Sequence, residues 1–324
     1  MFWRVLAIAL MAPSRAAVAI DDVVEIRAGT KVEFASAATG ARLLASRDVF
    51  VQAMSPFDRS ARLKTDKDVT EAEYLAFVGR QTRDWSDGEK QRLKAVLESF
   101  RARTARLDLR FPSSISLLKT TGLEEGMAAY CRGSSIVLPA KLVQRDSTEL
   151  ESTIFHELFH IYRRHHGENR RLLYKIIGFD VCPEIALPEE LRPRKITNPD
   201  APLLDSFIRI RVGGRRVPAA PVLIARTERY DVKQGGEFFA SMDFRLLVLE
   251  EIHGRFHPSM LPGGKPHLLN PAEVPDYLDQ VGRNTEYIIH PEEILADNFV
   301  LLVNGKSPVP SPGILQQMRS LLTR

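Results

Sequence analysis

Cysteine is scarce in this chain: among 324 residues there are only two, Cys131 and Cys182. A scaffold held together by several disulfides is therefore excluded, and at most one intramolecular bridge can form. The sequence gives no distance between the two thiols, so one bridge and two free buried thiols are equally compatible with it.

Long apolar runs and strong charge bias are also lacking. Beyond the amino terminus, no stretch approaches the roughly eighteen apolar residues of a membrane-spanning helix, which predicts no transmembrane segment. Lys and Arg number 45 against 41 Asp and Glu, a formal net charge of +4. This small excess, without a long basic run, predicts no nucleic-acid partner. The 44% hydrophobic and 27% charged content is that of an ordinary globular protein.

The first nineteen residues have the pattern of a secretory signal. Arg4 forms a short basic region, residues 5–12 form an apolar region, and Ala17-Val18-Ala19 is an A-x-A cleavage site. We therefore predict a signal peptide over residues 1–19 and an exported protein, periplasmic or extracellular, that begins at Ile20. Without Arg4 and Arg15, the mature chain would have 45 − 2 = 43 basic residues against 41 acidic ones, a net charge of +2. The alternative interpretation is a buried amino-terminal helix.

The most informative motif is His156-Glu157-Leu158-Phe159-His160, an H-E-x-x-H pattern inside an apolar run. Residues four apart share one face of a helix, so His156 and His160 can bind one metal ion while Glu157 reaches a metal-bound water. The predicted helix spans about residues 148–165, with Asp146 or Ser147 as its N-cap and Gly167 as its stop. A pair of structural histidines on an apolar face is the alternative.

A zinc hydrolase of this kind needs a third protein ligand, and two candidates compete. His166 stands where metzincins have their last histidine, but Arg163 replaces the glycine that lets the chain turn back. Glu293 lies on a predicted helix that starts at Pro291, with Asp297 four residues later on the same face. We favour Glu293 as the ligand and Asp297 as the acceptor that orients a ligand imidazole. Glu292 is the neighbouring alternative.

Two residues just before this helix are candidates for stabilising an oxyanion, Tyr287 and His290. An ordinary core tyrosine and a helix-capping histidine are alternatives of equal weight.

H-E-x-x-H followed by a helical E-x-x-x-D resembles the gluzincin metallopeptidases, the thermolysin-like superfamily. Residues 176–179, 195–200 and 287–299 are also similar to uncharacterised bacterial proteins grouped with those peptidases. The resemblance covers about a tenth of the chain, and the two metal-binding helices are much farther apart in sequence than in thermolysin. It implies a zincin-like fold, Zn²⁺ as cofactor, and zinc ligation by His156, His160 and Glu293.

The expected fold is α+β, with an N-terminal region over residues 20–105 and a zincin-like catalytic domain over residues 106–324. In the N-terminal region we expect a hairpin of residues 23–26 and 31–34, an irregular segment around residues 49–56, and helices capped by Thr70 and Ser86. In the catalytic domain, strands at 111–118 and 129–138 precede the H-E-x-x-H helix, and a β-rich insert covers about residues 206–250.

The predicted function is zinc-dependent hydrolysis of peptide bonds in a peptide or protein substrate, with Glu157 as base for a zinc-bound water. A hydrolase acting on a non-peptide amide or ester is one alternative. A non-catalytic zinc-binding protein is the other, although a structural zinc site does not need the base Glu157.

Overall fold

Helices and strands occur in separate groups along this chain. The computed structural model describes residues 22–323, and these form eleven α-helices and two six-stranded sheets, which confirms the α+β class. The predicted signal peptide and its cleavage after Ala19 lie outside the described residues. Within the described part of the chain, no helix has both the length and the apolarity needed to cross a membrane.

The first sheet combines parallel strands with an antiparallel edge. Its order is β1-β2-β4-β6-β5, with β2, β4 and β6 parallel, β5 antiparallel at one edge, and β3 paired with β4. The expected hairpin is confirmed as β1 and β2, and β2 pairs with β4, so the sheet joins residues on both sides of the division expected at residue 105. The single strand expected at 129–138 is instead a hairpin. The strands are β1 Val23–Arg27, β2 Thr30–Phe34, β3 Thr82–Arg83, β4 Ser114–Thr120, β5 Tyr130–Arg132 and β6 Ser135–Pro139.

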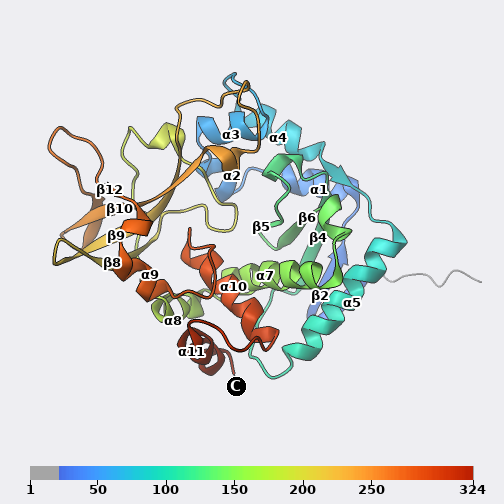
Figure 1. The fold of residues 1–324 in the computed structure, drawn as a ribbon. Helices are drawn as coiled ribbons and strands as arrows, with labels where there is room; N and C mark the ends of the chain where they lie inside the picture. Colours follow the sequence, from blue (N-terminus) through green and yellow to red (C-terminus); the bar gives the residue numbers. More distant parts are fainter. Residues whose placement is uncertain (1–21, 324) are drawn as a thin grey trace, which may run out of the picture.

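Alternating side chains of this sheet enter two different cores, as the period of a strand requires. Leu117 and Ile136 join the main core with helices α5 and α7, whereas Leu118 and Val137 join a smaller core with α1, α2 and α4. Figure 1 shows these helices on opposite sides of the sheet. Their bounds are α1 Ala37–Leu44, α2 Val49–Ala53, α4 Glu71–Gly79, α5 Asp87–Arg103 and α7 Ser147–His165, and the short helix α6 Ala140–Val143 leads into α7.

Residues 49–62 correct one expectation. They are helical, as α2 and α3 (Pro56–Arg62), because Asp48 caps α2 and Ser55 forms a capping box with Asp58 ahead of Pro56. The caps expected at Thr70 and Ser86 are confirmed, and each is part of a capping box.

The H-E-x-x-H helix α7 lies at the centre of the molecule (Figure 1). Asp146 is its N-cap, accepting hydrogen bonds from the backbone N–H groups of Thr148 and Glu149. Helix α10, Pro291–Val303, packs along α7, with the rings of Phe159 and Phe299 5.2 Å apart. Gly167 does not end the helical region as expected, because it begins α8, Gly167–Ile176. Helices α9, Pro275–Val281, and α11, Pro312–Leu322, complete this side.

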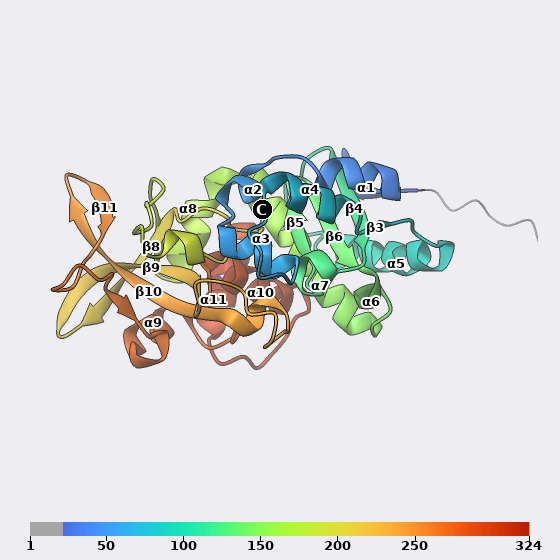
Figure 2. The ribbon, with the colours of Figure 1, turned by 90° about the horizontal axis from the view of Figure 1, so that it is seen from above.

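The β-rich segment expected at 206–250 is confirmed as most of a second sheet, with order β11-β10-β9-β8-β7 and β12 paired with β10. In the view from above it extends to one side, away from the first sheet (Figure 2). The polypeptide between β7 and β8 returns toward α7 and carries residues 195–200 to the site described below. The strands are β7 Phe179–Val181, β8 Ser206–Val212, β9 Arg215–Ala225, β10 Met242–Ile252, β11 Arg255–Pro258 and β12 Leu268–Leu269. The 3₁₀ turns are η1 Leu123–Glu125, η2 Arg192–Arg194, η3 Phe238–Ser241 and η4 Pro271–Glu273.

Candidate metal centre

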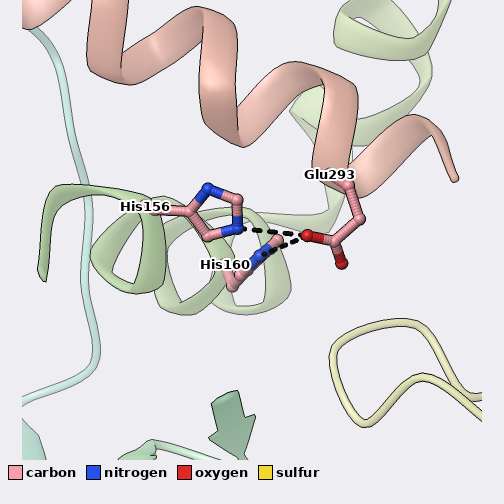
Figure 3. A group of neighbouring side chains, drawn as sticks. All are labelled: His156, His160 and Glu293. Atoms are coloured by element: carbon pink, nitrogen blue, oxygen red, sulfur yellow. Dashed lines mark hydrogen bonds and ion pairs between the residues drawn. The ribbon is translucent and has the colours of Figure 1, made fainter. Parts of the chain in front are cut away.

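Three predicted ligand residues meet between α7 and α10. The Nε2 atoms of His156 and His160 lie 3.1 Å and 3.6 Å from the same oxygen, Oε2 of Glu293 (Figure 3). Two ligand atoms about 2.1 Å from a tetrahedral zinc ion are about 3.4 Å apart, so these separations fit one such ion. The sequence prediction of this group thus agrees with the arrangement of the side chains, whereas His166 is outside it, stacked on Tyr162 at the end of α7.

A carboxylate faces the other nitrogen of each imidazole. Asp297 Oδ1 is 3.0 Å from Nδ1 of His156, and the Thr285 hydroxyl donates a hydrogen bond to the second Asp297 oxygen. Glu292 Oε2 is 3.7 Å from Nδ1 of His160. Both rings are therefore oriented with Nε2 toward Glu293, the arrangement that fixes the tautomer of a metal-binding histidine.

The sequence offers Glu292 only as an alternative ligand, whereas its surroundings in the structure come from residues on α7 and α8. It is fully buried, and it accepts hydrogen bonds from Arg163 on α7 and from the Tyr174 hydroxyl on α8. Burial alone would raise the pKa of Glu292, but the charge of Arg163 together with these contacts holds that pKa well below its usual range. Glu292 is thus a permanent negative charge behind His160.

The group of side chains favours positive charge at its centre. Burial would lower the pKa of His156, yet hydrogen bonds to Asp297 and Glu293 raise it to about 10. The pKa of His160 is also raised well above its usual value, since the nearby carboxylates outweigh burial. Both nitrogens of His160 are buried without a hydrogen-bond partner among residues 22–323. A divalent cation would satisfy the same carboxylates and give His160 the partner it lacks.

Glu157 lies beside this group on the wall of a cavity. Its side chain is buried, and its Oε2 accepts a hydrogen bond from the Cys131 thiol on β5 at 3.1 Å. Burial and the neighbouring Asp200 carboxylate raise the pKa of Glu157 to about 7. A carboxylate with such a pKa is suited to exchange protons near neutral pH.

Residues 195–200 supply two further groups that the sequence did not assign to the site. The Asn198 side-chain amide donates to Oε1 of Glu293 at 2.5 Å, and Oδ1 of Asp200 accepts the backbone N–H of Cys131 at 3.0 Å. The segment is anchored on α3, where both Asp58 oxygens accept the N–H of Thr197. The sequence signals for this segment are its resemblance to proteins grouped with the gluzincins and its N-P-D turn, and neither has a metal-binding spacing.

The cavity has a volume of about 290 Å³ and is open beside β5. His156, Glu157 and Glu293 contribute to its wall, as does Tyr287, which is 41% exposed. Much of the remaining wall is apolar, formed by Ala128, Ala129, Ile196, Leu223, Phe238, Phe239, Met242 and Ile289. Tyr287 is therefore placed to contact a bound molecule.

Three other sequence candidates lie elsewhere or have other contacts. His290 caps α10 by accepting the N–H of Glu292 on its Nδ1, and it lines a smaller neighbouring cavity instead of this one. Both cysteines are free: Cys131 is buried against Glu157, and Cys182 follows β7. The capping alternative for His290 and the free-thiol alternative for the cysteines are thus the observed ones.

Comparison with models of protein families, with curated proteins and with solved structures gave no match to this chain.

Proposed function

We propose that the protein is an exported zinc metallopeptidase of the gluzincin kind that cleaves peptide or protein substrates. The observation that carries this proposal is the convergence of His156, His160 and Glu293 next to a buried carboxylate, Glu157, in one open cavity. A site that only stabilised the fold would need neither the cavity nor Glu157.

The arrangement of the first sheet supports a peptide as the substrate. Helix α7 follows parallel strands whose outer edge is the antiparallel strand β5, and residues 128–130, which lead into that edge ahead of Cys131, line the cavity. A free strand edge can pair with an extended peptide through backbone hydrogen bonds. A small non-peptide amide or ester would make no use of this edge.

The roles of the side chains follow from their positions. When bound, zinc supplies a Lewis acid that makes water more acidic and polarises a carbonyl group. Glu157 takes the proton from the attacking water and returns it to the leaving amine, a transfer for which a pKa of about 7 is well matched. Tyr287 is our candidate to donate a hydrogen bond to the carbonyl oxygen as negative charge develops there. Asp297 and Glu292 hold the two imidazoles in place.

Metal analysis and one conservative substitution test the proposal. The purified protein should contain one zinc ion per chain, and His156→Ala should lose it. Glu157→Gln keeps the shape of the side chain and removes the proton acceptor, so zinc should remain while peptide hydrolysis falls about 100-fold or more.

Glu149→Gln is the matched control, since Glu149 lies on the same helix but pairs with Arg145 at the surface. Its activity should equal that of the unmodified protein. Full activity of Glu157→Gln, or a purified protein that takes up no metal, would refute the proposed function.

A further inference from the structure

Negative charge dominates the ionisable groups of the cavity. Four carboxylates contribute to its wall, and no lysine or arginine does among the described residues. Two of the four are already engaged: Arg62 forms paired hydrogen bonds with Glu125, and Glu293 belongs to the metal centre. Glu157 is the proposed base. The remaining carboxylate, Asp200, helps to raise the pKa of Glu157 but has no contact with substrate in the mechanism described above.

Asp200 is buried, but only one of its two carboxylate oxygens accepts a hydrogen bond among the described residues. It is 5% exposed, and the backbone N–H of Cys131 donates to its Oδ1. The guanidinium of Arg164 lies 3.6 Å from that same oxygen and does not contribute to the cavity wall. Among residues 22–323, no hydrogen bond reaches Oδ2. A carboxylate oxygen of Asp200 lies within 4.8 Å of one of Glu157, so Asp200 stands beside the proposed base.

Asp200 also closes the edge of β5. Cys131 pairs with Ile136 of β6 on one side. Its N–H points to the other side, where it donates a hydrogen bond to Asp200. A peptide that pairs with the edge near residues 128–130 cannot continue as a strand past Cys131. The bound chain must therefore turn away or end at Asp200.

The charge of Asp200 determines which end of a peptide fits. Beside Asp200 an α-carboxylate would be repelled and would find no lysine or arginine among the described residues of the cavity wall, whereas an α-ammonium group would find a carboxylate oxygen that accepts no other hydrogen bond. We infer that Asp200 receives the free α-ammonium group of the substrate, so that the enzyme removes residues from the amino terminus of peptides. This inference rests on the proposed function and adds the substrate class to it.

Blocking the ammonium group tests this directly. The zinc-loaded protein is given pairs of pentapeptides that begin with Leu or Phe, each with a free or an acetylated amino terminus. Mass spectrometry should show loss of the first residue from the free peptides, with kcat/KM at least about 10-fold above that of the acetylated ones. Equal cleavage of both forms, or release from the carboxyl end, would overturn the inference and leave the hydrolase proposal intact. No cleavage of any peptide would overturn both.

A substitution separates recognition from chemistry. Asp200→Asn retains an acceptor for the Cys131 N–H and removes the charge, so KM for free peptides should rise about 10- to 100-fold with a smaller change in kcat. Because Asp200 also raises the pKa of Glu157, a change in kcat should be shared by free and acetylated peptides. The specific effect is a fall of about 10- to 100-fold in the preference for free over acetylated peptides, measured as the ratio of their kcat/KM values. Asp279→Asn, at an exposed acid on α9, is the matched control. An unchanged KM for free peptides in Asp200→Asn would contradict the assignment.

Discussion

The carboxylates behind the two ligand histidines should affect the protein in different ways. Glu292 is fully buried beside Arg163, whose side chain is only 12% exposed, whereas the Asp297 side chain is 32% exposed. Glu292→Gln leaves the Arg163 charge buried without its ionic partner. Removing one partner of a buried ion pair costs about 3–5 kcal/mol, so we expect a loss of about 3 kcal/mol, because glutamine still accepts one hydrogen bond.

Asp297→Asn should destabilise the fold less, by about 1 kcal/mol, because solvent reaches Asp297, its amide oxygen still accepts a hydrogen bond, and Glu293 remains beside the charged His156. Both variants should bind zinc about 10- to 100-fold more weakly, since each removes the carboxylate that orients one imidazole and lets that ring rotate. The two substitutions thus share an effect on metal affinity and differ in their effect on stability.

Urea unfolding of the metal-free proteins measures the effect on stability, because bound metal would add its own stabilisation to the folded state. Competition with a chelator measures the effect on zinc affinity. The reasoning is refuted if Glu292→Gln unfolds at the same urea concentration as the unmodified protein. It is also refuted if zinc affinity falls in only one of the two variants.

Three further predictions concern ligation, pH and processing. Glu293→Ala should lose zinc in chelator competition more readily than either variant above, while His166→Ala should retain it; the reverse order would identify a metzincin-like site. Burial raises the pKa of Glu89, but Lys119 and Ser86 lower it more, and the net shift is downward. The stabilisation from Glu89 should therefore be complete above pH about 4.5 and shrink as the pH falls further. The difference in unfolding free energy between the unmodified protein and Glu89→Gln should become smaller in acid. A difference that does not change with pH would exclude this linkage. Mass spectrometry of exported protein should find Ile20 at the amino terminus, and a soluble chain that retains Met1 would exclude the signal peptide.

Short-range patterns in the sequence predicted the parts of the site that lie on one helix. The spacing of His156 and His160 placed both on one face of α7, and the spacing of Glu293 and Asp297 did the same on α10, because helical geometry depends only on neighbouring residues. The helix bounds were also predicted well, since caps such as Asp146 are local signals.

The remaining parts of the site depend on contacts between distant segments, which no spacing reveals. Asn198 and Asp200 reach the site because α3 anchors the segment before them, and Cys131 does so because β5 is the edge strand. The helical residues 49–62 are a different case. Ser55, Pro56 and Asp58 form a readable capping box, but α2 and α3 are too short for a hydrophobic period to appear.

The two histidines of the candidate metal centre lie far from its glutamate in the chain. From His160 to Glu293 the separation is 293 − 160 = 133 residues, and the whole second sheet lies within it. A metal ion held there would act as a cross-link that closes this long loop, and its binding energy would become folding energy for everything in between. A chain that ends before Pro291 would keep both histidines and the base yet have no complete centre. The proposed hydrolytic activity would therefore begin only when the carboxyl-terminal helices have docked, so that an unfinished chain could not digest itself or its neighbours.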